Sequence, residues 1–156
     1  MKLINESVQH VLEEMGINEQ ITFLEVDVGG SPNKNDKAVA NAAKVFLNAQ
    51  PHMSEWADEA EYFSIANHPE KGIIGSCAVV FASDTGEVGY AVDPAFQRRG
   101  IAMRLLKMAE AFLVRVNHQY AGARASSPES VQLLKKAGYT TSDTEMHNSW
   151  WEKELK

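Results

Sequence analysis

The sequence predicts one domain of the α/β class in its α+β form, with helices flanking a mixed, mostly antiparallel central sheet. Two observations support this fold class. Segments with the 3.6-residue period of amphipathic helices alternate with short runs rich in β-branched and aromatic residues, and three of these runs are joined by tight turns, as in an antiparallel meander. The chain has 156 residues, 44% of them hydrophobic, which is enough for a substantial core. No repeat or linker divides residues 1–156, so we expect a single domain.

Apolar spacing and end signals predict the helices. Gly16 and Gly138 stand where a left-handed C-terminal cap is expected, and Pro51 follows the second helix. Ser127 and Pro128 give the last helix an N-cap and a favourable first residue. We expect helices, the third of them a short turn, at about residues 4–15, 36–48, 54–59, 101–116 and 128–137.

Strand candidates are runs of β-branched and aromatic residues bounded by Gly, Pro, Asp and Asn. The turns NHPEKG and SDTG separate the three strands of the meander. The final segment WWEKEL, by its letters alone, could equally end a helix. About seven strands are expected, near residues 21–28, 61–67, 72–83, 87–92, 119–125, 139–142 and 146–155.

The charge balance and the single cysteine exclude several classes of function. Fifteen Lys and Arg against twenty-one Asp and Glu give a formal net charge of −6, which argues against a nucleic-acid binder that relies on many phosphate contacts. One cysteine, Cys77, allows no intramolecular disulfide, and the scattered histidines predict no metal site. No run approaches the about 20 apolar residues of a membrane span. We therefore expect a cytoplasmic protein that binds no membrane.

A basic stretch, VDPAFQRRGIAMRLL, joins the strand ending at Val92 to the helix that follows Gly100. In such a strand–loop–helix arrangement, consecutive backbone N–H groups at the helix start point to one place, where the helix dipole favours negative charge. Gly100 permits the necessary turn, and Arg98 and Arg99 can donate to phosphate oxygens. The alternative is a solvated helix start, although positive charge there opposes the dipole by about 0.3–1 kcal/mol per residue. We predict an anion site.

The chain has neither the G-x-x-x-x-G-K-[ST] loop of triphosphate binders nor the G-x-G-x-x-G of dinucleotide folds. Its loop instead resembles the acetyl-coenzyme A signature of the GNAT superfamily of N-acetyltransferases. The segment ARASSPESVQLLKKAGY, residues 123–139, also resembles that family's second conserved block. The resemblance covers about residues 20–155 and implies a GNAT-like fold with an extra N-terminal helix. The signature V-x-P followed by [QR]-x-x-G-x-[GA] is matched by Val92, Pro94, Gln97, Gly100 and Ala102.

This resemblance implies how acetyl-coenzyme A binds. Backbone groups of Ala91 and Val92 would hold the pantetheine arm between two strands that splay apart, and the amides from Arg98 to Met103 would cradle the pyrophosphate. An extended arm that carries amides satisfies unpaired strand N–H and C=O groups as another strand would. The residues implied for the cofactor are Ala91, Val92, Gln97, Arg98, Arg99, Gly100, Ile101, Ala102, Met103 and Ser127.

Three positions depart from the family pattern. Leu134 stands where the family often has a Tyr as general acid, and Ser127 stands where an Asn commonly contacts the cofactor. Gly122 replaces a Glu found in members that acetylate protein N-termini. The usual acid and base are therefore both missing from their expected positions.

Glu87, at the start of the central strand, is the expected catalytic base, because many members carry a carboxylate there that takes the ammonium proton. The alternative is a solvated residue that follows a turn. Small residues on the same strand face, Gly89 and Ala91, are expected to leave room for a substrate. For the acid that protonates the leaving thiolate, Ser127, Ser130 and Tyr139 stay open, as does water.

Two functions follow from this resemblance. The first is an N-acetyltransferase that moves an acetyl group from acetyl-coenzyme A to a primary amine of a small molecule or peptide by direct attack. The second is a non-catalytic acyl-coenzyme A binding module of the same fold, favoured by the missing acid and base. Substrate contacts are expected from residues 36–61 and from the loops around His68 and Asp143. Cys77 is expected to be a core thiol, and family resemblance implies a homodimer as one expected state.

Overall fold

The computed structural model describes residues 20–53, 55–143 and 148–155. Its centre is a six-stranded sheet in the order β1-β2-β3-β4-β5-β6. Neighbouring strands are antiparallel except β4 and β5, which are parallel. The mixed, mostly antiparallel sheet is therefore confirmed. The strands are β1 (Thr22–Asp27), β2 (Tyr62–His68), β3 (Gly72–Ala82), β4 (Thr85–Val92), β5 (Tyr120–Ala125) and β6 (Ser149–Glu154).

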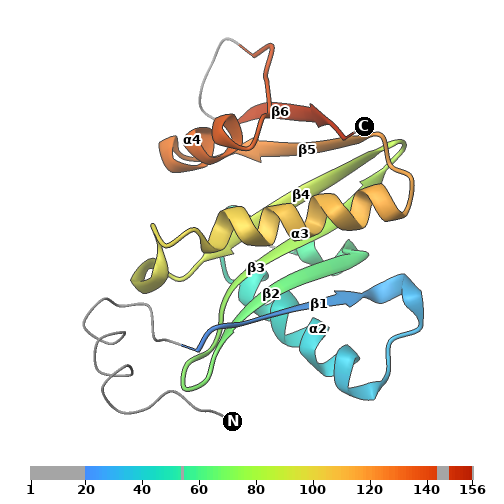
Figure 1. Cartoon of the computed structure of the whole chain (residues 1–156), viewed down its shortest axis with the longest axis vertical. Helices are drawn as coiled ribbons and strands as arrows, with labels where there is room; N and C mark the ends of the chain where they lie inside the picture. Colours follow the sequence, from blue (N-terminus) through green and yellow to red (C-terminus); the bar gives the residue numbers. More distant parts are fainter. Residues whose placement is uncertain (1–19, 54, 144–147, 156) are drawn as a thin grey trace.

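Three α-helices and three 3₁₀ turns flank this sheet in the described part of the chain, and the N-terminal helix expected near residues 4–15 lies outside it. Figure 1 shows α3 crossing the front of the strands and α2 behind them. None of the helices described is long and apolar enough to cross a membrane. The helical elements are η1 (Val28–Gly30), α2 (Lys34–Asn48), η2 (Trp56–Glu59), η3 (Pro94–Phe96), α3 (Ile101–Arg115) and α4 (Pro128–Lys136).

The helix starts follow local capping rules, as the sequence predicts for α4. The side chain of Asn33 accepts a hydrogen bond from the N–H of Asp36 at 2.7 Å and starts α2. Ser127 does the same for α4, accepting from the N–H of Ser130 at 3.1 Å, with Pro128 as the first helical residue. Each cap satisfies an amide that has no partner inside the helix, so these boundaries are set locally.

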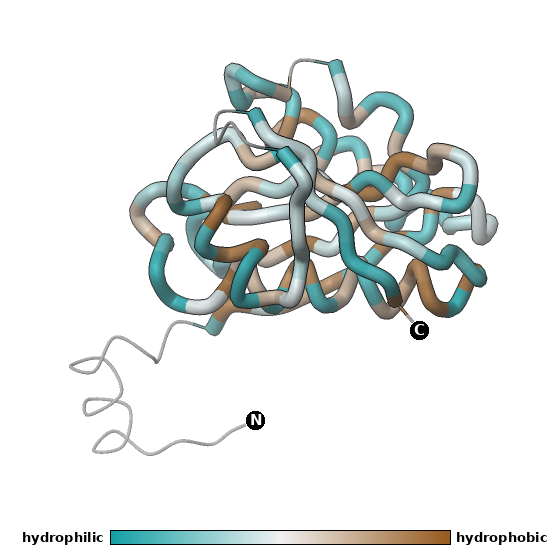
Figure 2. The backbone as a smooth tube through the Cα atoms, turned by 90° about the horizontal axis from the view of Figure 1, so that it is seen from above, coloured by the Kyte–Doolittle hydropathy of each residue, from teal (hydrophilic) through white to brown (hydrophobic). Residues whose placement is uncertain are grey.

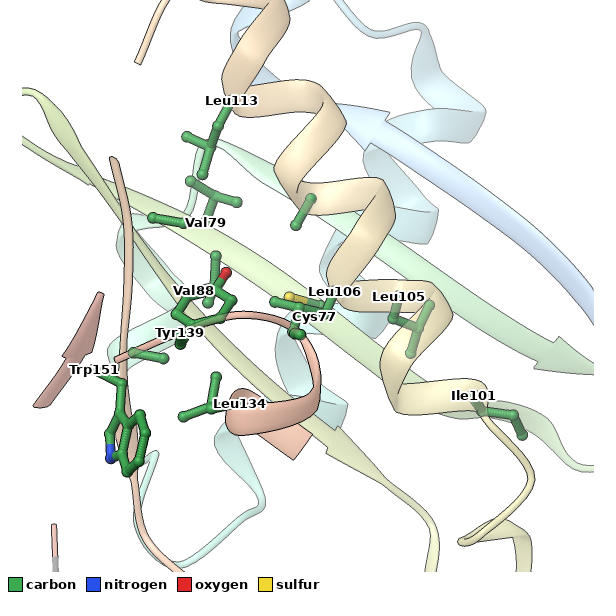
Figure 3. Packing of buried hydrophobic residues seen from close by; sticks show 14 of the residues in the cluster. Cys77, Val79, Val88, Ile101, Leu105, Leu106, Leu113, Leu134, Tyr139 and Trp151 are labelled. Carbon is green, nitrogen blue, oxygen red and sulfur yellow. The ribbon is translucent and has the colours of Figure 1, made fainter. Parts of the chain in front are cut away.

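Apolar clusters cover both faces of the sheet. Figure 3 shows α3 directing Leu105, Leu106 and Leu113 toward the strands, where they pack with Val79 and Val88. A second cluster joins the other face to α2 and η2. Side chains alternate between the two faces of a strand, and β2 and β3 contribute apolar side chains to the clusters on both faces. Each fully buried Leu or Val side chain stabilises the folded state by about 1.5–3 kcal/mol. The inner strands are therefore a rigid base for the adjoining cleft.

The parallel pair β4 and β5 is joined over only three residue pairs, Thr85↔Tyr120, Gly86↔Ala121 and Glu87↔Gly122. Both strands continue beyond these pairs, to Val92 and Ala125, without pairing to each other. Their separation opens a cleft, as expected for splayed strands, between the part of the sheet under α3 and the part under α4.

The prediction of a seventh strand at residues 139–142 is wrong, because the described residues show only one bridge there, between Thr140 and Glu152. Side chains replace the next steps of the ladder. The hydroxyl of Thr141 donates to the carbonyl of Trp150, and the carboxylate of Asp143 accepts from the N–H of Trp150 at 2.7 Å. Such side-chain bonds compete with regular sheet pairing.

The last strand, β6, is an edge of the sheet and begins at Ser149. Residues 146 and 147 of the expected strand lie outside the described residues. Trp150 and Trp151 belong to this strand and not to a helix end. Figure 2 shows the chain as hydrophilic along most of its final stretch to the C-terminus. The stretch 152–154 is Glu-Lys-Glu, and charges on an edge strand discourage pairing with another sheet.

Candidate functional site

The ladder between β3 and β4 determines which backbone groups face the cleft. The N–H of Asp93 donates to the carbonyl of Ile74 on β3 at 2.7 Å, and bonded pairs of an antiparallel ladder recur at every second residue. The register pairs Ala91 with Ser76, so the backbone groups of Ala91 also point to β3. Ala91 therefore does not offer its backbone to the cleft, in contrast to what the resemblance implied.

Tyr90 and Val92 hold the alternate positions, so their N–H and C=O groups point away from β3 and into the cleft. The side-chain amide of Gln97 donates to the carbonyl of Val92 at 3.0 Å, which agrees with this direction. Gln97 thus ties the loop to the end of β4. Unpaired strand groups are costly to leave bare, and an extended chain with amides would satisfy them.

The loop after β4 enters α3 through residues with positive φ. Arg98 has φ 66° and Gly100 has φ 80°, a region that costs residues other than glycine about 1–2 kcal/mol. Gly100 is the N-cap of α3, with no side-chain cap and no acidic residue in the first turn. The first bond within the helix runs from the N–H of Arg104 to the carbonyl of Gly100 at 3.1 Å. The amides of residues 101–103 lie ahead of it and have no acceptor inside the helix.

Basic side chains gather around this helix start. The guanidinium of Arg99 and the ammonium of Lys71 lie 5.1 and 5.7 Å from the centre of the Phe96 ring. The guanidinium of Arg104 lies 3.9 Å from the ring centre of Phe23. Cation–π contacts of this kind contribute about 0.5–1 kcal/mol at exposed sites. Lys71, on the distant turn between β2 and β3, was not predicted. The site is thus locally positive in a chain of net charge −6.

A pocket of about 290 Å³ lies along the same cleft. It is built by the segment that leads into η2, by β4, by β5, by the start of α4 and by Asn148 before β6, so five separate parts of the chain meet in it. Both a carboxylate and a guanidinium lie in its wall. The described residues that line it are His52, Met53, Trp56, Glu87, Val88, Gly89, Tyr90, Arg124, Ser126, Ser130 and Asn148.

Glu87, the predicted base, lies in this pocket at the last β4–β5 pair and is half-buried. Within the described residues no hydrogen bond or ion pair engages its carboxylate. A Cβ on Gly89 would lie 2.8 Å from Met53 Cε and from the indole of Trp56. Gly89 is therefore covered by these two side chains, and the prediction that it leaves room for a substrate is wrong. Together they form an apolar wall beside Glu87.

His52 is a pocket residue that the sequence did not distinguish from the other histidines. It precedes Met53 in the segment between α2 and η2 and lines the pocket together with Glu87. An imidazole can act as a general base near neutral pH. No spacing pattern could have identified it, because only the folding of this segment over β4 brings it to the site.

The three candidate acids have different surroundings. Ser130 lines the pocket, and its hydroxyl lies 2.7 Å from the hydroxyl of Tyr90 across the cleft. Burial raises the pKa of Tyr90 to about 12, an effect that the hydrogen bond with Ser130 partly offsets. Ser127 uses its hydroxyl as the helix cap. Tyr139 is buried, and burial together with the nearby Glu110 raises its pKa well above the usual range.

Leu134 and Tyr139 belong to the apolar cluster rather than to the pocket. Figure 3 shows both side chains packed between α4 and the strands. Leu134 is fully buried, so the position where the family often has a tyrosine contributes packing here. Cys77 is buried in the same cluster, and burial raises the pKa of its thiol, as expected for a core residue that does not act as a nucleophile.

Gly122 shows why a carboxylate is missing at its position. A Cβ on this residue would overlap the indole of Trp150, which lies on the neighbouring strand β6. The N–H of Trp150 donates to Asp143, and its Nε1 donates to the carboxylate of Glu152 at 2.9 Å. The indole ring therefore occupies the space that a side chain on residue 122 would need.

Only some of the segments that were expected to contact the substrate line the pocket. Met53 and Trp56 come from the predicted range 36–61, and Asn148 lies near the predicted Asp143 loop. The prediction for His68 is not met, because this residue is buried and its ring lies 5.3 Å from that of Phe96. His68 thus packs under the cofactor loop and does not line the pocket.

Comparison with known proteins agrees with this geometry. The model of the acetyltransferase (GNAT) family matches residues 40–139, which is more than half of the chain. No curated protein sequence matches significantly.

Several solved structures share the fold at low sequence identity. A GNAT-family acetyltransferase from Staphylococcus aureus Mu50 is 12% identical, with a TM-score of 0.62 over 87% of this chain and 99% of that one. The catalytic domain of Tetrahymena GCN5 histone acetyltransferase, in complex with coenzyme A, is 15% identical, with a TM-score of 0.64 over 88% and 94%. Salmonella typhimurium yncA, solved with its cofactor acetyl-CoA, is 14% identical, with a TM-score of 0.59 over 88% and 95%.

The separation of β4 from β5 and the glycine at the start of α3 agree with the family match. This chain therefore belongs to the GNAT family of acetyltransferases, which use acetyl-CoA.

Proposed function

We propose that this protein is an N-acetyltransferase that transfers the acetyl group of acetyl-CoA to a primary amine by direct attack within a complex of all three molecules. The observation that carries this proposal is the β4–β5 cleft. It connects the positive start of α3 to a pocket that contains Glu87. A donor site and an acceptor site that open into one cleft would allow the amine to reach the thioester without a covalent enzyme intermediate.

The residues present fit acetyl-CoA. The amides of residues 101–103 and the side chain of Arg98 would hold the pyrophosphate, since free N–H groups at a helix start bind phosphate oxygens. The backbone of Tyr90 and Val92 would pair with the amides of the pantetheine arm. When bound, acetyl-CoA supplies an activated acyl group with a thiol as leaving group.

The chemistry of the amine is assigned to pocket side chains. Glu87 would accept a proton from the ammonium form, directly or through water, and free the nitrogen lone pair. A cleft-facing N–H of β4 would donate to the acyl oxygen, where negative charge develops. The hydroxyl of Ser130, bonded to Tyr90, would provide the proton for the thiolate. Tyr90 stays protonated at neutral pH, because burial raises its pKa to about 12.

The proposal is tested by thiol release from acetyl-CoA in the presence of a panel of amines. Cys77 is buried, so a chromogenic thiol reagent should report the free coenzyme A and not the folded protein. General-base catalysis contributes about 10²–10⁴-fold, so Glu87→Gln should lower turnover by at least about a hundredfold, most strongly where the amine is protonated. The matched control is Glu154→Gln, an exposed carboxylate on β6.

Two results would redirect the assignment. If His52→Gln removed turnover while Glu87→Gln did not, the base would be the imidazole. If acetyl-CoA bound tightly and no amine released thiol above background, the protein would be the non-catalytic acyl-CoA module, the second function that its missing family residues favour.

A further inference from the structure

Arg124 is an unexplained positive charge in the acceptor pocket. It lies on β5, is exposed, and lines the pocket. Its Nη1 donates to the carbonyl of Asn148 at 3.4 Å, and within residues 20–53, 55–143 and 148–155 it forms no ion pair with a carboxylate. A guanidinium has five N–H donors in a fixed fork, so most of its donors have no acceptor among the described residues.

The guanidinium rests on a fixed platform. It lies 5.3 Å from the ring centre of Trp150. That indole lies over Gly122, and its Nε1 donates to the carboxylate of Glu152, while the backbone N–H of Trp150 donates to Asp143. A side chain that is already ordered loses less entropy when it binds a ligand. Arg124 is therefore prepared to bind an anion.

The carboxylate of Glu87 lies in the same pocket but is not paired with this arginine. Glu87 is opposite Gly122, and Arg124 is two residues farther along β5. Two residues span about 6.6 Å along a strand, and paired strands lie about 4.8 Å apart, so the two Cα atoms are at least about 8 Å apart where the strands diverge. Opposite charges thus face a shared space of about 290 Å³.

We propose that the acceptor is an amino carboxylate, a small molecule that carries both the primary amine and a carboxylate. The amine lies toward Glu87, and the carboxylate accepts two parallel hydrogen bonds from Arg124, a geometry that guanidinium favours. This inference rests on the proposed N-acetyltransferase function and narrows its substrate class. Purely cationic acceptors such as polyamines gain nothing from Arg124, because like charges repel.

The reaction on such an acceptor balances without any further reagent. The ammonium loses a proton to Glu87, the amine nitrogen forms a bond to the acyl carbon, and the bond from that carbon to sulfur breaks. The nitrogen then loses its second proton, which the thiolate takes by way of the Ser130 hydroxyl. Glu87 releases its proton to water, and the products are an N-acetylated amino carboxylate and coenzyme A. Arg124 takes no part in these steps and acts as a specificity residue.

The test compares amines that differ only in the carboxylate: phenylalanine with phenethylamine, 4-aminobutyrate with propylamine, and lysine with cadaverine. Hydrogen bonds to charged groups suggest that kcat/KM is about tenfold to a hundredfold higher for at least one carboxylated member than for its partner. Arg124→Ala should abolish that ratio by raising the KM of the amino carboxylate, with little change in kcat or in coenzyme A affinity.

Two further variants separate this role from a general structural effect. Arg124→Lys should keep only part of the preference, because an ammonium cannot form the two-bond fork. The control Arg115→Gln removes an exposed arginine that lies at the end of α3, pairs with Glu25 and does not line the pocket, and it should leave the ratio unchanged.

The outcomes distinguish this inference from the function on which it rests. Equal or better turnover of every decarboxylated amine, or a ratio that survives Arg124→Ala, would overturn the assignment to Arg124 while the acetyltransferase stands. If no amine releases thiol, the proposed function fails, and calorimetry of the same amino carboxylates against the coenzyme A complex decides the role of Arg124. Binding that Arg124→Ala removes would support it, and absence of binding would refute it.

Discussion

The two ends of the β4–β5 cleft present different kinds of chemical group. The donor end is the start of α3, and the acceptor end is the pocket that contains Glu87. At the start of α3 the proposed binding groups are mainly backbone amides, and the basic side chains of Lys71, Arg99 and Arg104 lie near it. In the pocket the groups are side chains from five separate parts of the chain, and they include both a carboxylate and a guanidinium. One end requires only a strand, a glycine and a helix. The other depends on which residues happen to meet.

This difference teaches how one fold can keep a donor and change its acceptor. Amides at a helix start recognise phosphate oxygens whatever the neighbouring side chains are, so the donor end can stay constant. Substitutions in the pocket change the shape and charge available to the acceptor. We expect substitutions at the start of α3 to change the affinity for coenzyme A and substitutions in the pocket to change the KM of the amine. Substitutions in the paired stretch of β4 and β5 should change both.

The largest effect is expected at the donor end. Replacing Arg98 and Arg99 by Ala should weaken coenzyme A binding by about 1.5–3 kcal/mol for each charged hydrogen bond lost, which is at least a tenfold rise in Kd by calorimetry. The KM of the amine should not change. Because salt screens exposed charges, the difference in coenzyme A affinity between variant and wild type should be smaller at high salt. Unchanged affinity at low salt would remove these arginines from the pyrophosphate site.

A substitution in the paired stretch of β4 and β5, which supports both ends, should affect both through stability. A Cβ on Gly86 would overlap the side chain of Leu113 on α3, and overpacking of this kind costs about 1–3 kcal/mol. Gly86→Ala should therefore lower the midpoint of urea unfolding and impair both substrates together. The control is Gly29→Ala, where the nearest atom would lie 3.6 Å from the new Cβ. Equal midpoints for both variants would contradict the close packing of α3 on β4.

A third prediction concerns Tyr90, whose hydroxyl bridges the cleft to Ser130. Burial raises its pKa to about 12, whereas tyrosines of an unfolded chain ionise near pH 10. The folded state therefore keeps a proton that the unfolded state loses, and the free energy of unfolding should fall as pH rises from about 10 to 12. In Tyr90→Phe, the loss between pH 9 and pH 11 should be smaller by about 1 kcal/mol.

Denaturant unfolding at these two pH values measures the effect. Burial raises the pKa of Tyr62 and Tyr139 even further, so the variant should still lose stability in alkali. The same pH dependence in variant and wild type would mean that Tyr90 is solvated in the folded state.

The smallest effect is expected at the acceptor end. Gly122→Ala should displace the indole of Trp150 and so remove its contact with the guanidinium of Arg124. A cation–π contact of this kind contributes about 0.5–1 kcal/mol. The KM of an amino carboxylate should rise about two- to fivefold, with coenzyme A affinity unchanged. A rise in the Kd of coenzyme A without a change in amine KM would show that the two ends are not independent.

The local structure at the start of α3 could be predicted from the sequence because its information is local. Gly100 with its positive φ and the amides of residues 101–103 lie within a few residues of the helix start that they form. The prediction failed where register decides, because Ala91 and Val92 are neighbours in sequence and point their backbone groups to opposite sides. Only pairing with β3 assigns each of them a direction.

The acceptor end could be predicted only in part. The family resemblance and strand alternation pointed to Glu87, which does line the pocket, but they did not point to His52, Arg124 or the Tyr90–Ser130 contact. These residues carry no common spacing, and they meet because the segment before η2 folds over β4 while β5 separates from it. The absent seventh strand has a similar cause, since Thr141 and Asp143 bond to Trp150 only after β6 has been positioned.

The sequence by itself determined α2, α3 and α4, the six strands in chain order and the glycine that starts α3, because periodicity, caps and glycine conformation act over a few residues. The tertiary structure alone decided which backbone groups open into the cleft and which charges share the pocket. Those choices depend on strand register and on contacts between residues far apart in the chain, and no local pattern encodes them.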